Sequence, residues 1–436
     1  MSTVYPAGRH LGGEVHAERA PWLIWASFTS ACLGWMFDAM DLQLFTFILF
    51  PSVSDLIGSA DPRLVAYTGG VIVACKLLAW GLGGIAFGIV ADRTGRSKTL
   101  LLMVLLYSVF TALGSLAQNW WQLAILQALA GIGVGGEWAA GAALVTETWP
   151  ERTRARAMQA MQMCFAFGFF LAAVLNLFIG PLGWRWVLLA GGTPAVITLF
   201  IRRFVPEPER WISARSRQHA AARHGAPDTA ARTFLAIFVP PVRRSTIVGV
   251  LIASVMMIGS WGAGTLLPTW IRQLLGPDQI ARGVTVTSQC FMLSTAGAVL
   301  GYLTLMWLTE SIGRRWSYFL VVVGAAGANV FQYTQITTIG QLLCFMPVHG
   351  FFAIGGFGVF ATYLPELFPT HIRATGLGFS WNMARVFTAA GPFVSGMLVA
   401  ASGSIPPAGI TVTWVYLIGM IAIWFGPETR GMALED

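Results

Sequence analysis

The sequence is short of charge. Asp, Glu, Lys and Arg make up 11% of its 436 residues, whereas 56% are hydrophobic. Soluble domains carry about a quarter charged residues, so this composition argues against a soluble enzyme. The sequence also lacks a P-loop, an H-E-x-x-H motif and a G-x-S-x-G motif, and so gives no support to ATP-driven transport or hydrolase chemistry. Its five cysteines lie in apolar runs and predict no disulfide framework. We therefore expect no enzyme, no nucleotide, no metal and no cofactor.

Long hydrophobic runs are what the sequence has instead. A transmembrane helix needs about 20 apolar residues. Twelve runs meet this need, at 22–50, 64–91, 99–117, 121–148, 156–179, 185–204, 245–271, 284–308, 316–335, 339–364, 375–401 and 408–426. The first run begins too late and is too long for a cleaved signal peptide. The sequence therefore predicts an all-α integral membrane protein with twelve transmembrane helices in a lipid bilayer, the first of them ending at Pro51.

Basic residues are concentrated in alternate loops. If the N-terminus is cytoplasmic, the tails and loops on its side hold 21 of the 27 Lys and Arg residues, and the opposite side holds four. Cytoplasmic loops of membrane proteins carry such an excess, so we expect both termini in the cytoplasm. The same distribution accounts for the net charge of +8, which leaves no reason to expect a nucleic-acid partner.

The two halves of the sequence repeat each other. Residues 147–154 (Glu-x-x-Pro, then Arg) correspond to 366–373, and residues 92–96 (acid-x-x-Gly-Arg) to 310–314, at offsets of 219 and 218. The repeat predicts six-helix bundles at 22–204 and 245–426, a cytoplasmic linker at 205–244, and cytoplasmic tails at 1–21 and 427–436. Two repeated bundles with a binding site between them at mid-membrane are typical of secondary transporters.

One loop motif resembles a known family. Residues 88–98 read Gly-x-x-x-Asp-Arg-x-Gly-Arg-x-Lys, which is similar to the loop motif of the major facilitator superfamily. The resemblance covers about 22–431, although the second copy is degenerate, with Met306 and Glu310 at its glycine and aspartate positions. It implies the major facilitator fold and a cytoplasmic gate. The gate residues would be Asp92, Arg93, Arg96, Glu147, Arg154, Glu207, Glu310, Arg314, Glu366, Arg373 and Glu428.

The charges of this gate have a simple physical interpretation. Acids and arginines at cytoplasmic helix ends can pair across helices only when that side is closed, so their charge-assisted pairs favour one of two conformations. The alternative is that the arginines only follow the positive-inside rule.

Five ionisable residues interrupt the hydrophobic runs: Asp38, Asp41, Lys76, Glu137 and Arg385. At about 2.5–3.5 kcal/mol each for insertion, their combined cost approaches roughly 15 kcal/mol, so we expect interior partners or a water-filled cavity. Lys76 and Arg385 are candidates to bind a substrate carboxylate. The three acids are candidates to carry a proton. The alternatives are a structural ion pair between Asp41 and Lys76, and an Arg385 that only satisfies backbone carbonyls.

Four other residues inside the runs are candidates to line a substrate cavity: Asn382, Gln289, Trp35 and His349. Against this, an interior tryptophan more often packs between helices, and an interior histidine is more often a satisfied structural residue. The Gly-x-Gly-x-x-Gly at 131–136 matches the dinucleotide fingerprint but lies in an apolar run, where small residues let helices approach closely.

Within the superfamily, Asp38-x-x-Asp41, the Gly-Gly-Glu-Trp at 135–138 and Asn382-x-x-Arg385 resemble the aromatic-acid:proton and sialate/lactate:proton symporters. This resemblance implies proton-coupled import of a small organic anion, either a monocarboxylate or an aromatic carboxylate. We expect a monomer in the bacterial cytoplasmic membrane. The alternatives are a proton-driven exporter, a symporter of zwitterions or osmolytes, and a nutrient sensor on a transporter fold, which the short tails disfavour.

Overall fold

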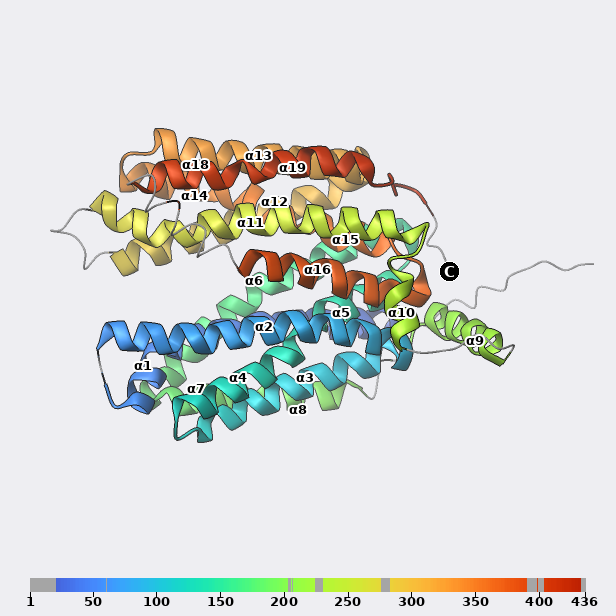
Figure 1. Ribbon diagram of the computed structural model, residues 1–436, viewed down its shortest axis with the longest axis horizontal. Coiled ribbons are helices and arrows are strands. Elements are labelled where there is room, and N and C mark those ends of the chain that lie inside the picture. The colour runs from blue at the N-terminus through green and yellow to red at the C-terminus, as the bar shows by residue number, and fades with distance from the viewer. Residues whose placement is uncertain are drawn as a thin grey trace, which may run out of the picture.

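The computed structural model describes residues 21–59, 61–202, 205, 207–223, 230–275, 283–389, 398 and 404–432, and all regular secondary structure in them is helical. The helices run side by side in two groups (Figure 1). We call α1 to α8 the N-half and α11 to α19 the C-half. In Figure 1 the C-half lies above and most of the N-half below, with α6 and α16 between them.

The N-half crosses the molecule six times. Its segments are α1 (Pro21–Ile57), α2 (Pro62–Thr94), α3 (Arg96–Leu113), α4 (Trp120–Gly135) followed by α5 (Glu137–Thr148), α6 (Arg154–Ile179), and α7 (Trp184–Ala190) followed by α8 (Thr193–Arg202). The C-half repeats the plan. Its segments are α11 (Val242–Leu275), α12 (Gly283–Ser311), α13 (Arg314–Gln335), α14 (Ile339–Ala353) followed by α15 (Gly358–Glu366), α16 (Arg373–Ala389), and α18 (Ile405–Thr413) followed by α19 (Val415–Ala422).

Each predicted hydrophobic run coincides with one of these twelve segments. The last part of the eleventh run, 390–401, lies outside the described residues apart from residue 398. Within the described ranges, nine helices are long and apolar enough to cross a membrane. The other three segments are the broken pair α7–α8, the more polar α13, and α16, of which 17 residues are described.

The prediction that Pro51 ends the first helix is wrong. Helix α1 continues through Pro51 to Ile57. A proline removes one backbone N–H from the helix ladder and crowds the preceding turn. Packing beyond the proline offsets this cost, because Val53 is fully buried and Asp55 accepts hydrogen bonds from Trp184 Nε1 (3.0 Å) and Arg185 Nη1 (2.7 Å).

Two of the membrane-crossing segments break at equivalent places in the repeat. The α4–α5 segment breaks at Gly136, and the α14–α15 segment has a 3₁₀ turn at Gly355–Phe357. Both breaks fall in glycine-rich sequence, and glycine is a poor helix former. The first break makes Glu137 the opening residue of α5, where the partial positive charge of a helix N-terminus favours a carboxylate.

The halves meet where α2 packs against α16 and where α6 packs against α12 and α15. Glycines allow the first contact. A Cβ at Gly84 would overlap the amide of Asn382, and one at Gly88 would overlap the carbonyl of Ala374. Small residues spaced in this way let membrane helices approach closely. These glycines therefore let α2 pack directly against α16.

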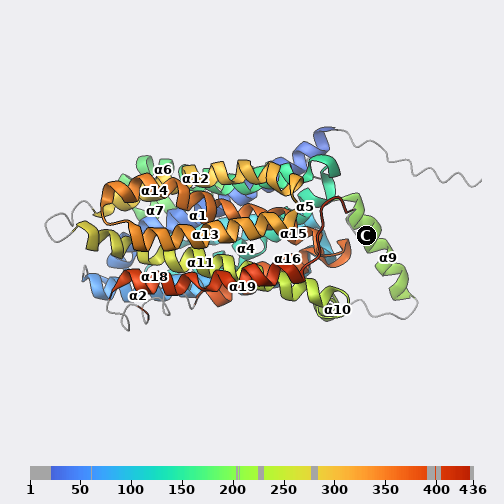
Figure 2. The same cartoon turned by 90° about the horizontal axis from the view of Figure 1, so that it is seen from above.

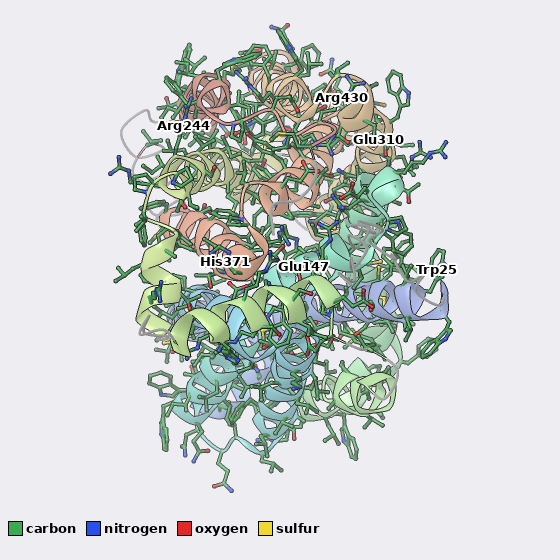
Figure 3. All side chains as sticks on the ribbon, turned by 90° about the vertical axis from the view of Figure 1, so that its right-hand side faces the viewer. Trp25, Glu147, Arg244, Glu310, His371 and Arg430 are labelled. Carbon is green, nitrogen blue, oxygen red and sulfur yellow. The ribbon has the colours of Figure 1, made fainter. Side chains whose placement is uncertain are left out.

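The predicted linker, 205–244, contains helices rather than only loop: α9 (Glu209–Arg223) and α10 (Ala230–Ala236) lie within it. In Figures 1 and 2, α9 lies across the end of the molecule where α2 meets α3 and α5 meets α6. Figure 3 views this end, with Glu147, Glu310, His371 and Arg430 labelled. We call it the charged end.

The sides of the helices are apolar. Leu82, Phe170 and Met292 are among many large apolar side chains that are exposed, each by about two thirds or more (68%, 70% and 72%). Soluble proteins rarely expose large contiguous apolar surface. Helices whose backbone hydrogen bonds are satisfied within themselves can present such side chains to lipid. The surface therefore agrees with a membrane-spanning protein.

Candidate functional site

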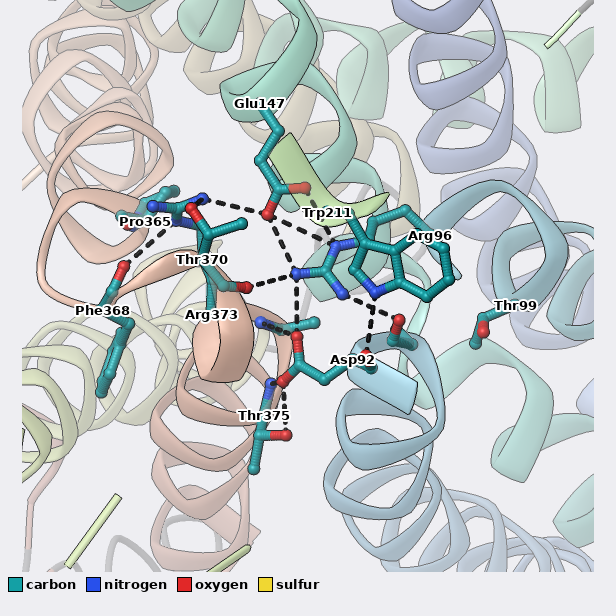
Figure 4. Close-up of polar contacts among 12 residues, drawn as sticks. Asp92, Arg96, Thr99, Glu147, Trp211, Pro365, Phe368, Thr370, Arg373 and Thr375 are labelled. Carbon is teal, nitrogen blue, oxygen red and sulfur yellow. Dashed lines mark hydrogen bonds and ion pairs between the residues drawn. The ribbon is translucent and has the colours of Figure 1, made fainter. Parts of the chain in front are cut away.

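At the charged end, one carboxylate joins the two halves (Figure 4). Glu147, near the end of α5, accepts hydrogen bonds from Arg96 Nε (3.1 Å) and Nη2 (3.0 Å) in the N-half. Its Oε1 also accepts one from Arg373 Nη1 (3.0 Å) in the C-half. Both arginines are fully buried. Buried charges are stable only when paired, so separating the halves here would leave Arg373 without its carboxylate.

Asp92, in the last turn of α2, reaches the first turn of α16. Its carboxylate accepts hydrogen bonds from the backbone N–H groups of Ala374 (3.2 Å) and Thr375 (2.7 Å) and from the Thr375 hydroxyl (2.6 Å). It also forms an ion pair with Arg96 at 2.9 Å. The first N–H groups of a helix have no partner within the helix, so Asp92 caps α16 from the opposite half.

Helix α9 of the linker covers this contact. The indole N–H of Trp211 donates to the carbonyl oxygen of Asp92 at 2.8 Å, and its ring lies 6.0 Å from the Arg96 guanidinium carbon. Arg96 also donates to the Thr370 carbonyl of the C-half at 2.7 Å. Sequence reasoning missed Trp211, Thr370 and Thr375. The two threonines flank the predicted Arg373, whereas nothing in the linker sequence singles out Trp211.

The second copy of the network is incomplete. Glu366 accepts from Arg314 Nε (2.9 Å) and Nη2 (2.7 Å), as Glu147 does from Arg96. However, Glu310 forms its ion pair with Arg156, which is 61% exposed, at 3.1 Å. Arg154 pairs with Glu151 at 3.2 Å. In the described residues, Glu147 thus pairs with Arg96 and Arg373, and Glu366 pairs with Arg314. Arg93 is half-buried near the end of α2.

Two predicted gate acids have equivalent roles in the repeat. Glu207 accepts from the backbone N–H groups of Ser97 (3.2 Å) and Lys98 (3.0 Å), and Glu428 from those of Arg314 (2.9 Å) and Arg315 (3.1 Å). Each acid therefore caps a helix that begins just after a glycine. The backbone of Gly95 (φ 121°, ψ 152°) is in a region that is almost confined to glycine.

In the interior of the N-half, Lys76 is paired. Its Nζ lies 2.9 Å from Asp41 Oδ2, and both side chains are almost completely buried. Asp41 Oδ1 accepts a hydrogen bond from the Thr111 hydroxyl (2.5 Å). The geometry matches the alternative in which Asp41 and Lys76 form a tie between α1 and α2, here extended to α3.

Arg385, on α16, is differently placed. It is half-buried, and its Nη1 donates to Asn382 Oδ1 at 3.0 Å. Its guanidinium carbon lies 4.1 Å from the ring centre of Trp80 in the other half. In the part of the chain that the structure describes, no carboxylate lies within ion-pair distance of it. Asn382 donates to the carbonyl oxygens of Gly378 (2.8 Å) and, across the halves, Gly135 (3.3 Å).

In the described part of the chain, Asp38 and Glu137 are buried acids without a hydrogen-bond partner. Each is 1% exposed, and among the described residues neither carboxylate has a hydrogen-bond partner. Asp38 lies near enough to Arg385, Asp41 and Lys76 to interact with them electrostatically, and Glu137 near enough to Asp38 and Asp41. The structure therefore brings the five predicted intramembrane charges into one group.

The remaining candidates separate into different surroundings. Trp35 is buried against Phe165, with ring centres 4.6 Å apart, and its indole N–H has no partner among the described residues. His349 Nε2 lies 3.2 Å from Asn329 Oδ1 within the C-half. Gln289 is exposed on α12. Sequence reasoning gave no special weight to the Trp138–Trp381 stack, which joins the halves with ring centres 4.3 Å apart.

Known proteins are similar to this chain in sequence and in fold. The family model of the Major Facilitator Superfamily matches residues 28–303. The chain is 31% identical to the probable 4-methylmuconolactone transporter of Cupriavidus pinatubonensis, over 94% of this chain and 91% of that protein. It is 27% identical to the niacin transporter NiaP and to the cis,cis-muconate transport protein of Acinetobacter baylyi, each over 93% of this chain and 94% of the relative.

A solved structure agrees. The proton:xylose symporter XylE, bound to 6-bromo-6-deoxy-D-glucose, has a TM-score of 0.75 at 19% identity, over 95% of this chain and 98% of that chain. The chain therefore belongs to the major facilitator superfamily. It is an integral membrane transporter of small organic molecules with two six-helix bundles, and not an enzyme.

Proposed function

We propose that the protein imports a small organic anion together with a proton, by alternating access, as a monomer in the bacterial cytoplasmic membrane. The bundles span 22–204 and 245–426, the linker is 205–244, and both tails and the charged end face the cytoplasm. The 21-to-4 distribution of basic residues supports this orientation. The relatives named for niacin and cis,cis-muconate support a carboxylate cargo, because both compounds carry carboxyl groups.

The observation that carries the proposal is the combination of Arg385 with Asp38 and Glu137. Arg385 is a half-buried cation that contacts the Asn382 amide and the Trp80 ring, and among the described residues it forms no ion pair with an acid. Its planar guanidinium can bind a carboxylate through two hydrogen bonds. Asp38 and Glu137 are unpaired acids nearby, and a buried acid is most stable when it is protonated.

The charges give a reason for coupling. Two cations and three acids in one group sum to −1, so a bound monoanion and two added protons make the group neutral. A neutral group is easier to keep in a low-dielectric interior. We propose that Asp38 and Glu137 take up the protons. Asp41 is the weaker candidate because Lys76 and Thr111 occupy its oxygens. Trp35, Asn382, His349 and Gln289 remain proposed cavity residues.

The charged end supports the gating part of the proposal. Glu147, Asp92 and Arg96 make contacts between the halves there, which supports a closed state on this side. An importer must open it to release its cargo. The cross-half contacts are the ones that must break, whereas the Arg314–Glu366 pair lies within one half and can persist in both states.

Transport by purified protein in liposomes tests the coupling. With an imposed pH gradient, we expect accumulation of a labelled monocarboxylate or aromatic carboxylate, alkalinisation of the medium from which the protons are removed, and loss of accumulation when a protonophore is added. Accumulation that survives the protonophore would refute proton symport and indicate a facilitator or another coupling ion. The same assay in inverted vesicles separates import from export.

Calorimetry on variants tests the binding site. We expect Arg385→Gln to abolish anion binding in folded protein. Arg385→Lys should also fail, because an ammonium group cannot make the two-point contact of a guanidinium. Binding within about threefold of the parent in Arg385→Gln, equal to roughly 0.65 kcal/mol, would refute the role of Arg385. Lys76→Gln separates the two cations: retained binding would assign Lys76 to the structural pair with Asp41.

A further inference from the structure

The gate is asymmetric in a way that leaves a charged cavity. In the repeat, Glu366 corresponds to Glu147 and Arg154 to Arg373. Glu147 bridges arginines of both halves, but Glu366 is occupied by Arg314 and by the Thr429 hydroxyl. Arg154 pairs with Glu151 instead. Among the described residues, Arg154 and Glu366 therefore do not form the bridge that Arg373 and Glu147 form, although Arg156 and Glu310 still pair across the halves. Arg154 and Glu366 instead both line an open space at this end.

This space is a cavity of about 220 Å³ at the charged end, which we call the arginine cavity. Arg152, Arg154 and Glu151 line it from the N-half, and Arg314 and Glu366 from the C-half. Residues 431–432 of the C-terminal segment complete it. Its lining thus comes from both halves, so an occupant can contact both at once.

The charges in the lining favour an anion. Both acids are already engaged: Glu151 pairs with Arg154 and Arg210, and Glu366 pairs with Arg314. The three arginines and two acids of the lining sum to a charge of +1, and Arg210, which also pairs with Glu151, adds a fourth cation beside it. Arg154 is 6% exposed, and in the described part of the chain its buried Nε–H has no hydrogen-bond acceptor. A buried donor on a cation that lacks an acceptor is costly unless a ligand supplies one.

We propose that the arginine cavity binds a small oxyanion of the phosphate type, which bridges Arg154 and Arg314 as Glu147 bridges Arg373 and Arg96. Arginine forks match phosphate oxygens with two-point hydrogen bonds. The cavity volume suits such an ion, since sites for drug-sized molecules run from about 300 to 1,000 Å³. Bound there, the oxyanion strengthens closure of the charged end. This inference is independent of the transported substrate.

Thermal unfolding of the full-length protein in detergent tests the proposal. Inorganic phosphate is titrated at constant ionic strength set by chloride, because phosphate also stabilises proteins non-specifically. We expect a saturable rise of the unfolding temperature, as a ligand specific to the folded state produces. Arg154→Gln should weaken the apparent affinity at least tenfold. Arg243→Gln, which removes an exposed arginine at the start of α11 outside the cavity, should keep the parent response.

Two further arms keep the outcome decisive. If Arg154→Gln does not fold, Arg152→Gln replaces it, because Arg152 is exposed and lines the same cavity. Nanodiscs with phosphatidic acid, compared with phosphatidylcholine alone, separate a lipid headgroup from free phosphate as the source: only a headgroup ligand stabilises the parent without added phosphate. A response that does not saturate, or that is equal in the parent and both cavity variants, overturns the proposal.

Discussion

Replacing Asp92 by asparagine should open the charged end, whereas the equivalent change in the other repeat, Glu310→Gln, should not. The substitutions are chemically matched, since each turns a carboxylate at the end of a helix into an amide. Asp92 is 2% exposed and accepts three hydrogen bonds from the first turn of α16. Glu310 makes one exposed ion pair with Arg156. The structural difference predicts very different costs.

The magnitudes follow from these contacts. An amide retains one acceptor oxygen, which at the Oδ2 position keeps both bonds from Thr375. Asp92→Asn then loses the bond from the Ala374 N–H to a charged group, which is worth about 1.5–3 kcal/mol. A loss of about 1.5–3 kcal/mol shifts the equilibrium between the closed and open states by roughly 10- to 150-fold. An exposed ion pair contributes about 0–1 kcal/mol, so Glu310→Gln should shift the equilibrium by less than about sixfold.

Hydrogen exchange of the peptide that contains residues 374 and 375 measures this difference. The N–H groups of these two residues are protected by Asp92, and exchange of a protected amide reports the free energy of local opening. We expect exchange in this peptide to accelerate strongly in Asp92→Asn and to remain near the parent rate in Glu310→Gln. Similar acceleration in both variants, or none in Asp92→Asn, would refute the view that the Asp92 cap holds the halves together.

Three further predictions concern stability. Gly95→Ala should lower the unfolding temperature by several degrees, because the backbone conformation of Gly95 costs other residues about 1–3 kcal/mol. Gly70→Ala should not lower it, because a Cβ added at Gly70 would meet open space. Equal effects of the two substitutions would contradict this reasoning. Burial, followed by repulsion from neighbouring arginines, lowers the pKa of His371. The unfolded chain then binds the proton more readily, so stability should fall as pH drops below about 6.5, and His371→Gln should show a shallower fall over that range in pH-dependent melting. Lys76→Met should destabilise the protein by about 3–5 kcal/mol because it leaves the buried Asp41 carboxyl group without its cation, and adding Asp41→Asn should recover most of this loss in denaturant unfolding. A double variant as unstable as Lys76→Met would argue against the pair.

The interior charges show how far sequence reasoning extends to the site. The cost of Asp38, Asp41, Lys76, Glu137 and Arg385 in a membrane predicts that they have partners, because each lies within an apolar run. It cannot predict which partners, because several arrangements satisfy the same charges. The structure pairs Lys76 with Asp41 and places Arg385 against Trp80 and Asn382.

The sequence by itself determined the number of membrane-crossing segments, their approximate ends and the repeat. Segment length and hydropathy are local properties of the sequence, and the thickness and apolar interior of the bilayer set the values that a spanning segment needs. It misjudged Pro51, where packing beyond the proline carries α1 on to Ile57. In the described residues, the tertiary structure pairs Arg154 with Glu151 rather than with Glu366. Only the tertiary structure decided that Glu147 bridges to Arg373, 226 residues away, and that Asp92 caps α16. These contacts join different halves, and they depend on how the bundles dock, which no local pattern encodes.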